Sequence, residues 1–174
     1  MKKIISALLT LAMLLSLMAV FTGCGDKETE KKDTKEPTSS STPADDNTTD
    51  VTLPAAISGI SKMDVPDISG TGWELVGGIV DGVEMEIEDV QTVLTNFGGR
   101  MDFIFGEGDK VSLTNGETAL ETTYRVTDGK VIYMDFNEYK YHAVFTDVNG
   151  SVVLIIANET EPNSALYFQQ LIVE

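Results

Sequence analysis

The chain is very poor in cysteine and histidine, since Cys24 and His142 each occur only once among its 174 residues. A single cysteine cannot form a disulfide within the chain, so no internal crosslink stabilises the fold. Structural metal sites need several cysteine or histidine ligands at short spacing, whereas these two residues lie far apart. We therefore expect no bound metal and no other cofactor.

Basic residues are also scarce. The chain has 12 Lys and Arg against 28 Asp and Glu, which gives a formal net charge of −16. Binding to nucleic acid needs a basic footprint that neutralises phosphates, so nucleic acid is excluded as a partner. The same negative charge repels anionic lipid headgroups, so any membrane association must rest on apolar groups.

The longest apolar run lies at the N-terminus. Lys2 and Lys3 precede the uncharged segment IISALLTLAMLLSLMAVFT, and the small residues Thr22 and Gly23 lead directly to Cys24. A basic start, an apolar stretch and a small-residue cleavage site are typical of a secretory signal peptide, which we place at residues 1–23.

The cysteine after this site resembles the lipobox of bacterial lipoproteins, although Phe21 stands where that family usually has leucine. The resemblance implies that the thiol of Cys24 carries diacylglycerol, which anchors the chain to the extracytoplasmic face of a bacterial cell membrane. The alternative is an uncleaved transmembrane helix, because the apolar run is long enough to span a bilayer. In both cases Lys2 and Lys3 keep the N-terminus inside, and the rest of the chain lies outside the cytoplasm.

A polar segment follows the cysteine. Between residues 26 and 53 the only apolar residues are Ala44, Val51 and Leu53. Such a segment cannot bury enough apolar surface to offset the entropy of ordering, so we expect residues 24–53 to form a disordered tether.

Residues 54–69 regain hydrophobicity without a clear period, so we expect a lead-in that partly packs on the domain. The domain itself is expected to cover residues 70–174. We also expect a chain that begins at Ile60 to be as stable as one that begins at Gly25.

Most of the domain alternates between apolar and polar residues in short runs separated by turn residues, which predicts antiparallel β-structure. Asp128-Gly129 and Asn149-Gly150 indicate tight hairpins, because a type I′ turn needs positive φ at both central residues. In residues 120–126 the pattern places Leu120, Thr122, Tyr124 and Val126 on a core-like face. The segment SVVLIIA is apolar on both faces, which indicates a strand covered on two sides. The eight expected strands are 72–79, 101–106, 111–113, 120–126, 130–136, 139–146, 151–157 and 165–173.

One helix is predicted within residues 88–99. Val90, Val93, Leu94 and Phe97 recur at helical spacing, and Gly98 with its neighbouring glycine supplies a C-terminal stop. The acidic residues just before it are explained by the helix dipole, which favours anions at a helix N-terminus.

This layout is similar to that of the small lipocalin-like domains of bacterial lipoproteins. The features that carry the resemblance are GTGWELV, the Asp81-Gly82 turn, a short acidic helix ending in glycine, MDFIFGEGDKVSL, TTYRVTDGK and an apolar closing strand. The resemblance implies an all-β fold with one short helix: an up-and-down antiparallel β-barrel of about eight strands. It carries over no catalytic residues.

An eight-stranded barrel is just wide enough for side chains to fill it or for one small ligand to enter. Strands of this length favour a filled interior over an open pocket. The candidates for core or ligand-lining positions are Trp73, Phe103, Phe105, Tyr124 and Phe145.

The residues offer little for catalysis. His142 is expected on the barrel surface, on the face opposite Tyr141, and an acylated Cys24 cannot act as a nucleophile. The segment DGVEMEIED lacks calcium ligands where Val83 and Met85 stand. The sequence therefore favours a monomeric, non-catalytic binding or interaction module over an envelope enzyme. Its partner would be an envelope protein or, as the alternative, a small hydrophobic molecule carried in the barrel mouth.

Overall fold

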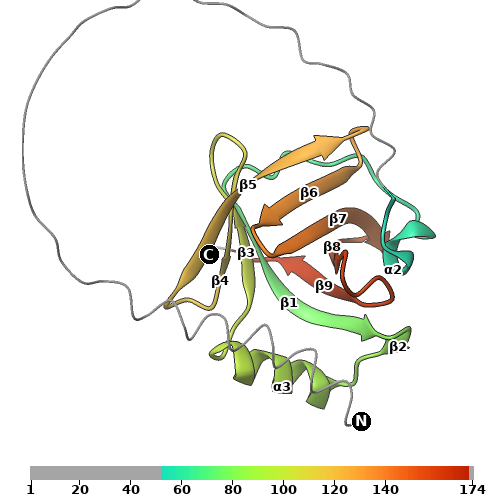
Figure 1. Ribbon diagram of the computed structural model, residues 1–174, viewed down its shortest axis with the longest axis vertical. Helices are drawn as coiled ribbons and strands as arrows, with labels where there is room; N and C mark the ends of the chain where they lie inside the picture. The colour runs from blue at the N-terminus through green and yellow to red at the C-terminus, as the bar shows by residue number, and fades with distance from the viewer. Residues whose placement is uncertain (1–51, 173–174) are drawn as a thin grey trace, which may run out of the picture.

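The computed structural model describes residues 52–172 (Figure 1). Cys24, the expected signal peptide and nearly all of the expected tether lie outside these residues. Within the described part of the chain, no helix is long and apolar enough to cross a membrane.

The strands form one antiparallel sheet in the order β2-β1-β3-β4-β5-β6-β7-β8-β9. A further pairing of β1 with β9 closes this sheet into an eight-stranded barrel, from which β2 extends as a short extra strand. The predicted up-and-down β-barrel is thus confirmed. The strands are β1 (Thr71–Val80), β2 (Val83–Glu84), β3 (Asp102–Phe105), β4 (Lys110–Thr114), β5 (Ala119–Thr127), β6 (Val131–Phe136), β7 (Tyr139–Val148), β8 (Ser151–Asn158) and β9 (Ala165–Gln170).

Tight turns set the register of the later strands. Asp128 and Gly129 have φ values of 53° and 66°, and Asn149 and Gly150 have values of 56° and 85°. These positive values at consecutive positions are those that type I′ hairpins require, so both predicted hairpins are confirmed.

Aromatic side chains fill the barrel interior. Trp73, Phe103, Phe105, Phe145 and Phe168 are all among the largest fully buried side chains, together with aliphatic residues of β6 and β8. The rings of Phe103 and Phe168 meet edge to face with centroids 5.2 Å apart. Because close-packed side chains leave little empty volume, the centre of the barrel holds no wide channel.

The lead-in closes one end of the barrel. The amide of Met63 donates to the carbonyl of Phe145 (2.9 Å), and that of Val65 donates to the carbonyl of Gly129 (2.7 Å). Ile68 is buried in the main core beneath this segment. In Figure 1 the segment crosses the upper end of the barrel between α2 and the start of β1.

The short helix α2 (Ala55–Ser58) covers the outer face of the barrel. Ile57 is fully buried there in a second apolar cluster with Val144, Ile155 and Ala157. The cluster explains why SVVLIIA is apolar on both faces. A chain that began at Ile60 would lack Ile57, and its stability relative to a chain that begins at Gly25 stays a prediction.

Helix α3 (Ile87–Phe97) lies at the opposite end of the barrel, beside β1 (Figure 1). It buries Val90, Val93 and Phe97 against the main core, as the helical spacing predicted. The Asp89 carboxylate accepts a hydrogen bond from the amide of Glu86 (3.2 Å) at its start. Gly98 ends the helix with a φ of 106°, a left-handed conformation that glycine adopts without steric cost.

One predicted core position is wrong. Val126 is 44% exposed, although it alternates in phase with Tyr124. Strand β5 pairs with β4 through Thr123 and with β6 from Tyr124 onward, so Val126 lies in the part of β5 that has left β4.

Candidate functional site

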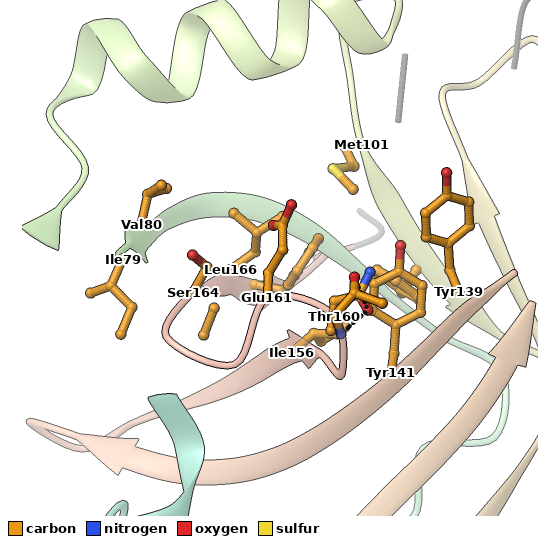
Figure 2. Close-up of a pocket in the computed structure, with 14 residues that line it drawn as sticks. Ile79, Val80, Met101, Tyr139, Tyr141, Ile156, Thr160, Glu161, Ser164 and Leu166 are labelled. Atoms are coloured by element: carbon orange, nitrogen blue, oxygen red, sulfur yellow. Dashed lines mark hydrogen bonds between the residues drawn. The ribbon is translucent and has the colours of Figure 1, made fainter. Parts of the chain in front are cut away.

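A cavity opens at the α3 end of the barrel, and we call it the mouth cavity (Figure 2). Its volume is about 150 Å³, which is similar to that of an apolar protein cavity able to hold one benzene molecule. Its apolar wall consists mainly of Val80, Met101, Phe103, Ile156, Leu166 and Phe168. The cavity therefore suits one small apolar group and is too short for a long acyl chain.

Polar side chains form the rim of the mouth cavity. Tyr139 and Tyr141 come from β7, whereas Glu161 and Ser164 come from the β8–β9 loop. Figure 2 shows the carboxylate of Glu161 and the hydroxyls of both tyrosines pointing to the same side of the cavity. A ligand held by the apolar wall would thus meet these groups with its polar end.

Hydrogen bonds fix the loop that carries Glu161. The amide of Thr160 donates to Asn158 Oδ1 (3.0 Å) at the start of the loop. At its other end, the amide of Asp81 donates to Ser164 Oγ (3.1 Å), and the amide of Gly82 donates to the carbonyl of Asn163 (3.0 Å). The loop is thereby joined to the β1–β2 turn, which preorganises this part of the rim.

Burial changes the titration of the rim groups. It raises the pKa of the Tyr141 phenol far above its ordinary value, with Tyr139 and Glu161 adding to the effect. The pKa of the Glu161 carboxyl is also raised, first by burial and then by the negative charge of Asp81. Glu161 as a whole residue is exposed, so its carboxyl is only partly desolvated. Both phenols are neutral near neutral pH, because their pKa values lie above the ordinary 10.0.

His142 is not at the surface, contrary to the expectation from sequence, and is only 1% exposed. It does lie on the face opposite Tyr141, but Leu53, Pro54 and Pro162 surround it on the outside of the barrel. These residues are remote from His142 in sequence. Strand alternation therefore predicts correctly which face His142 lies on but does not predict that it is buried.

A polar cluster surrounds His142 on the outer wall. Its Nε2 atom lies 2.8 Å from Glu159 Oε1, and the guanidinium of Arg125 stacks over the ring of Tyr133 at 4.2 Å. The Nδ1 atom is buried without a hydrogen-bond partner among the described residues. The ring of His142 is thus held on the outer wall by Glu159 and by edge-to-face packing against Tyr133, with centroids 5.3 Å apart.

The structure separates the residues predicted to be core or ligand-lining. Trp73, Phe105 and Phe145 are buried in the core, whereas Phe103 also reaches the mouth cavity. Tyr124 is half-buried with its ring 5.3 Å from that of Phe105. Cys24, the predicted lipidation site, lies outside the described residues.

Sequence reasoning missed the rim as a site. Strand alternation in residues 139–146 places Tyr139 and Tyr141 on one face, but it does not show how far along the barrel axis a residue lies. Glu161 sits in a polar loop without periodicity, so no local signal brought it near the tyrosines. Within residues 52–172, no three metal-ligating side chains come together.

No protein-family model, curated protein or solved structure matched the chain in the comparisons made. The barrel architecture therefore rests on the structure alone. Membership of the lipocalin-like lipoprotein domains stays a prediction from sequence.

Proposed function

We propose that this protein is a lipid-anchored, non-catalytic binding module on the extracytoplasmic face of a bacterial membrane. The observation that carries the proposal is the mouth cavity: side chains fill the barrel interior and leave, at its α3 end, a cavity large enough for one aromatic ring. Such a cavity can receive an apolar side chain of an envelope protein. The apolar wall also favours a second candidate, a carrier of a small hydrophobic molecule.

The binding role is tested with benzene, which matches the size of the mouth cavity. Benzene should shift the NMR signals of the Met101 methyl group and of Leu166. Val80→Trp should fill the cavity from its apolar wall and abolish these shifts. Val148→Trp is the matched control, since Val148 is 48% exposed and lies at the end of β7 opposite to Tyr139. Absence of any shift in the unmodified protein would contradict the binding role.

The two candidates differ in what occupies the cavity in cells. Native mass spectrometry of the protein purified from membranes should find no bound small molecule if the cavity receives a partner's side chain. A stoichiometric small hydrophobic compound, lost in Val80→Trp and retained in Val148→Trp, would instead establish the carrier.

The membrane anchor is tested at Cys24. Serine cannot be acylated by the lipoprotein route, so Cys24→Ser should accumulate as an unprocessed or soluble chain. Ser40→Ala, a change in the same polar segment, should be processed normally. Mass spectrometry of the membrane fraction distinguishes the outcomes, and an intact N-terminal segment with an unmodified cysteine would establish a transmembrane helix instead.

A further inference from the structure

The rim of the mouth cavity carries charge of one sign. Glu161 is the only charged side chain among the described residues that line the cavity, and neither lysine nor arginine is among them. Asp81 lies close enough to Glu161 to act on its titration. A ligand carboxylate would therefore meet repulsion here, whereas a cation would meet attraction.

The two rim tyrosines present aromatic rings at the same place. The rings of Tyr139 and Tyr141 are stacked, with centroids 6.5 Å apart and planes inclined by 26°. The face of an aromatic ring attracts cations, and the attraction grows where water is excluded. Because both phenols are neutral, their hydroxyls add hydrogen-bonding capacity without adding charge.

The inner wall of the cavity has a different chemistry. Phe103, Ile156 and Phe168 are buried, and they offer only apolar surface to a ligand. A ligand that satisfied both regions would have an apolar body of about one ring and a single positive charge at one end.

We propose that the mouth cavity selects small organic cations, with the hydrocarbon body against the apolar wall and an ammonium group among Glu161, Tyr139 and Tyr141. This inference rests on the proposed binding role of the cavity and specifies its ligand class. An amine presented by a free small molecule and one presented by a partner's side chain would be recognised by the same groups.

Three probes of similar size and shape isolate the effect of ligand charge on affinity. Benzylamine is positively charged at neutral pH, toluene is neutral and benzoate is negatively charged. Calorimetric or NMR titration of the folded protein should give benzylamine an affinity about tenfold higher than that of toluene, as expected for a partly desolvated cation near aromatic faces and a carboxylate. Benzoate should bind more weakly than toluene.

Two variants locate the source of the selectivity. Glu161→Gln should reduce the preference for benzylamine over toluene to less than about twofold, while toluene affinity stays within about twofold of its original value. Glu107→Gln is the matched control, because Glu107 is exposed in the β3–β4 loop and does not line the cavity. It should retain most of the preference.

The pH dependence gives an independent measurement. The titratable groups near the Glu161 carboxyl are Asp81 from the β1–β2 turn and the two phenols from β7. The phenols do not ionise in acid, so the preference for benzylamine should decline as the pH falls through the raised pKa of Glu161. Asp81→Asn should move this decline to lower pH, and Glu161→Gln should abolish it.

The outcomes separate the inference from the proposed function. If toluene and benzylamine bind equally, the cation selectivity is overturned while the binding role stands. If neither compound binds, the binding role itself is overturned. A preference for benzylamine that persists in Glu161→Gln would also overturn the inference, because it would place the selectivity elsewhere.

Discussion

The indole of Trp73 on β1 meets the ring of Phe145 on β7 edge to face, with centroids 5.1 Å apart across the barrel interior. Its Nε1 atom donates to Thr71 Oγ1 (2.9 Å), and this hydroxyl in turn donates to the carbonyl of Ile68 (2.7 Å). The buried polar atom is thus satisfied, and the same chain of hydrogen bonds joins the core to the lead-in.

Trp73→Ala should lower the free energy of unfolding by about 3–5 kcal/mol, the range for truncating a large core aromatic. Domains of this size are stable by only about 5–15 kcal/mol, so the variant should be close to unfolded. The unmodified protein should show blue-shifted tryptophan fluorescence that moves to the red on denaturation. Solvent-like emission from the folded protein, with little loss of stability in the variant, would contradict the core role.

Ile57 tests whether α2 contributes to stability. Its side chain is fully buried on the outer wall, so Ile57→Ala should lower the free energy of unfolding by about 2–5 kcal/mol. Ile87→Ala provides the same change at a position that is 68% exposed, and its effect should stay within about 0.5 kcal/mol. Urea unfolding of both variants measures the difference, and equal effects would show that α2 does not stabilise the barrel.

Gly78 lies opposite Leu166 where β1 pairs with β9. An added Cβ would stand 2.6 Å from the carbonyl oxygen of Ala165 and 2.9 Å from Met85 Sδ. Gly78→Ala should therefore lower the free energy of unfolding by about 1–3 kcal/mol through overpacking. An added Cβ at Gly59 would meet nothing within 4 Å, so Gly59→Ala serves as the control. Thermal melting of both variants checks the difference, and an unchanged melting temperature for Gly78→Ala would show that the strands can separate at no cost.

Tyr141 should make the protein sensitive to alkali. Burial raises the pKa of its phenol in the folded state above the ordinary 10.0 of an exposed tyrosine. When the pH exceeds the ordinary pKa of tyrosine, the phenol of the unfolded chain loses its proton while that of the folded chain retains it. The contribution of Tyr141 to the free energy of unfolding is therefore complete at lower pH and declines as the pH rises.

The loss of stability in alkali should be smaller in Tyr141→Phe than in Tyr133→Phe, because Tyr133 lies on the outer face and is only partly buried. Urea unfolding between neutral pH and strong alkali measures it. Parallel curves for the two variants would show that Tyr141 ionises as easily in the folded state as in the unfolded state.

Most of the barrel could be predicted from sequence because successive residues of each strand alternate between the inner and the outer face. The alternation of Tyr139, Tyr141, Ala143 and Phe145 is imposed by the pleat, and the hairpin turns are encoded by residues that tolerate positive φ. Burial depends also on what covers a face, and for His142 the cover comes from Pro54 and Pro162, which no local pattern connects to it.

The mouth cavity could not be predicted for a related reason. Its rim combines β7 with a loop that follows β8, and the loop is placed by hydrogen bonds from the β1–β2 turn. Periodicity describes one strand at a time, whereas a site at the end of a barrel depends on the axial position that strand stagger gives to every strand.

The pairing of β1 with β9 closes the barrel through segments that are separated by nearly the whole domain. Contacts of such high sequence separation must overcome a large loop-closure entropy, so folding is expected to be slow compared with that of a helical domain of similar size. Until β9 docks, β1 and β8 each retain an unpaired edge that can recruit strands from other chains. The pairing of β9 therefore controls whether a newly made chain becomes a closed barrel or an aggregate.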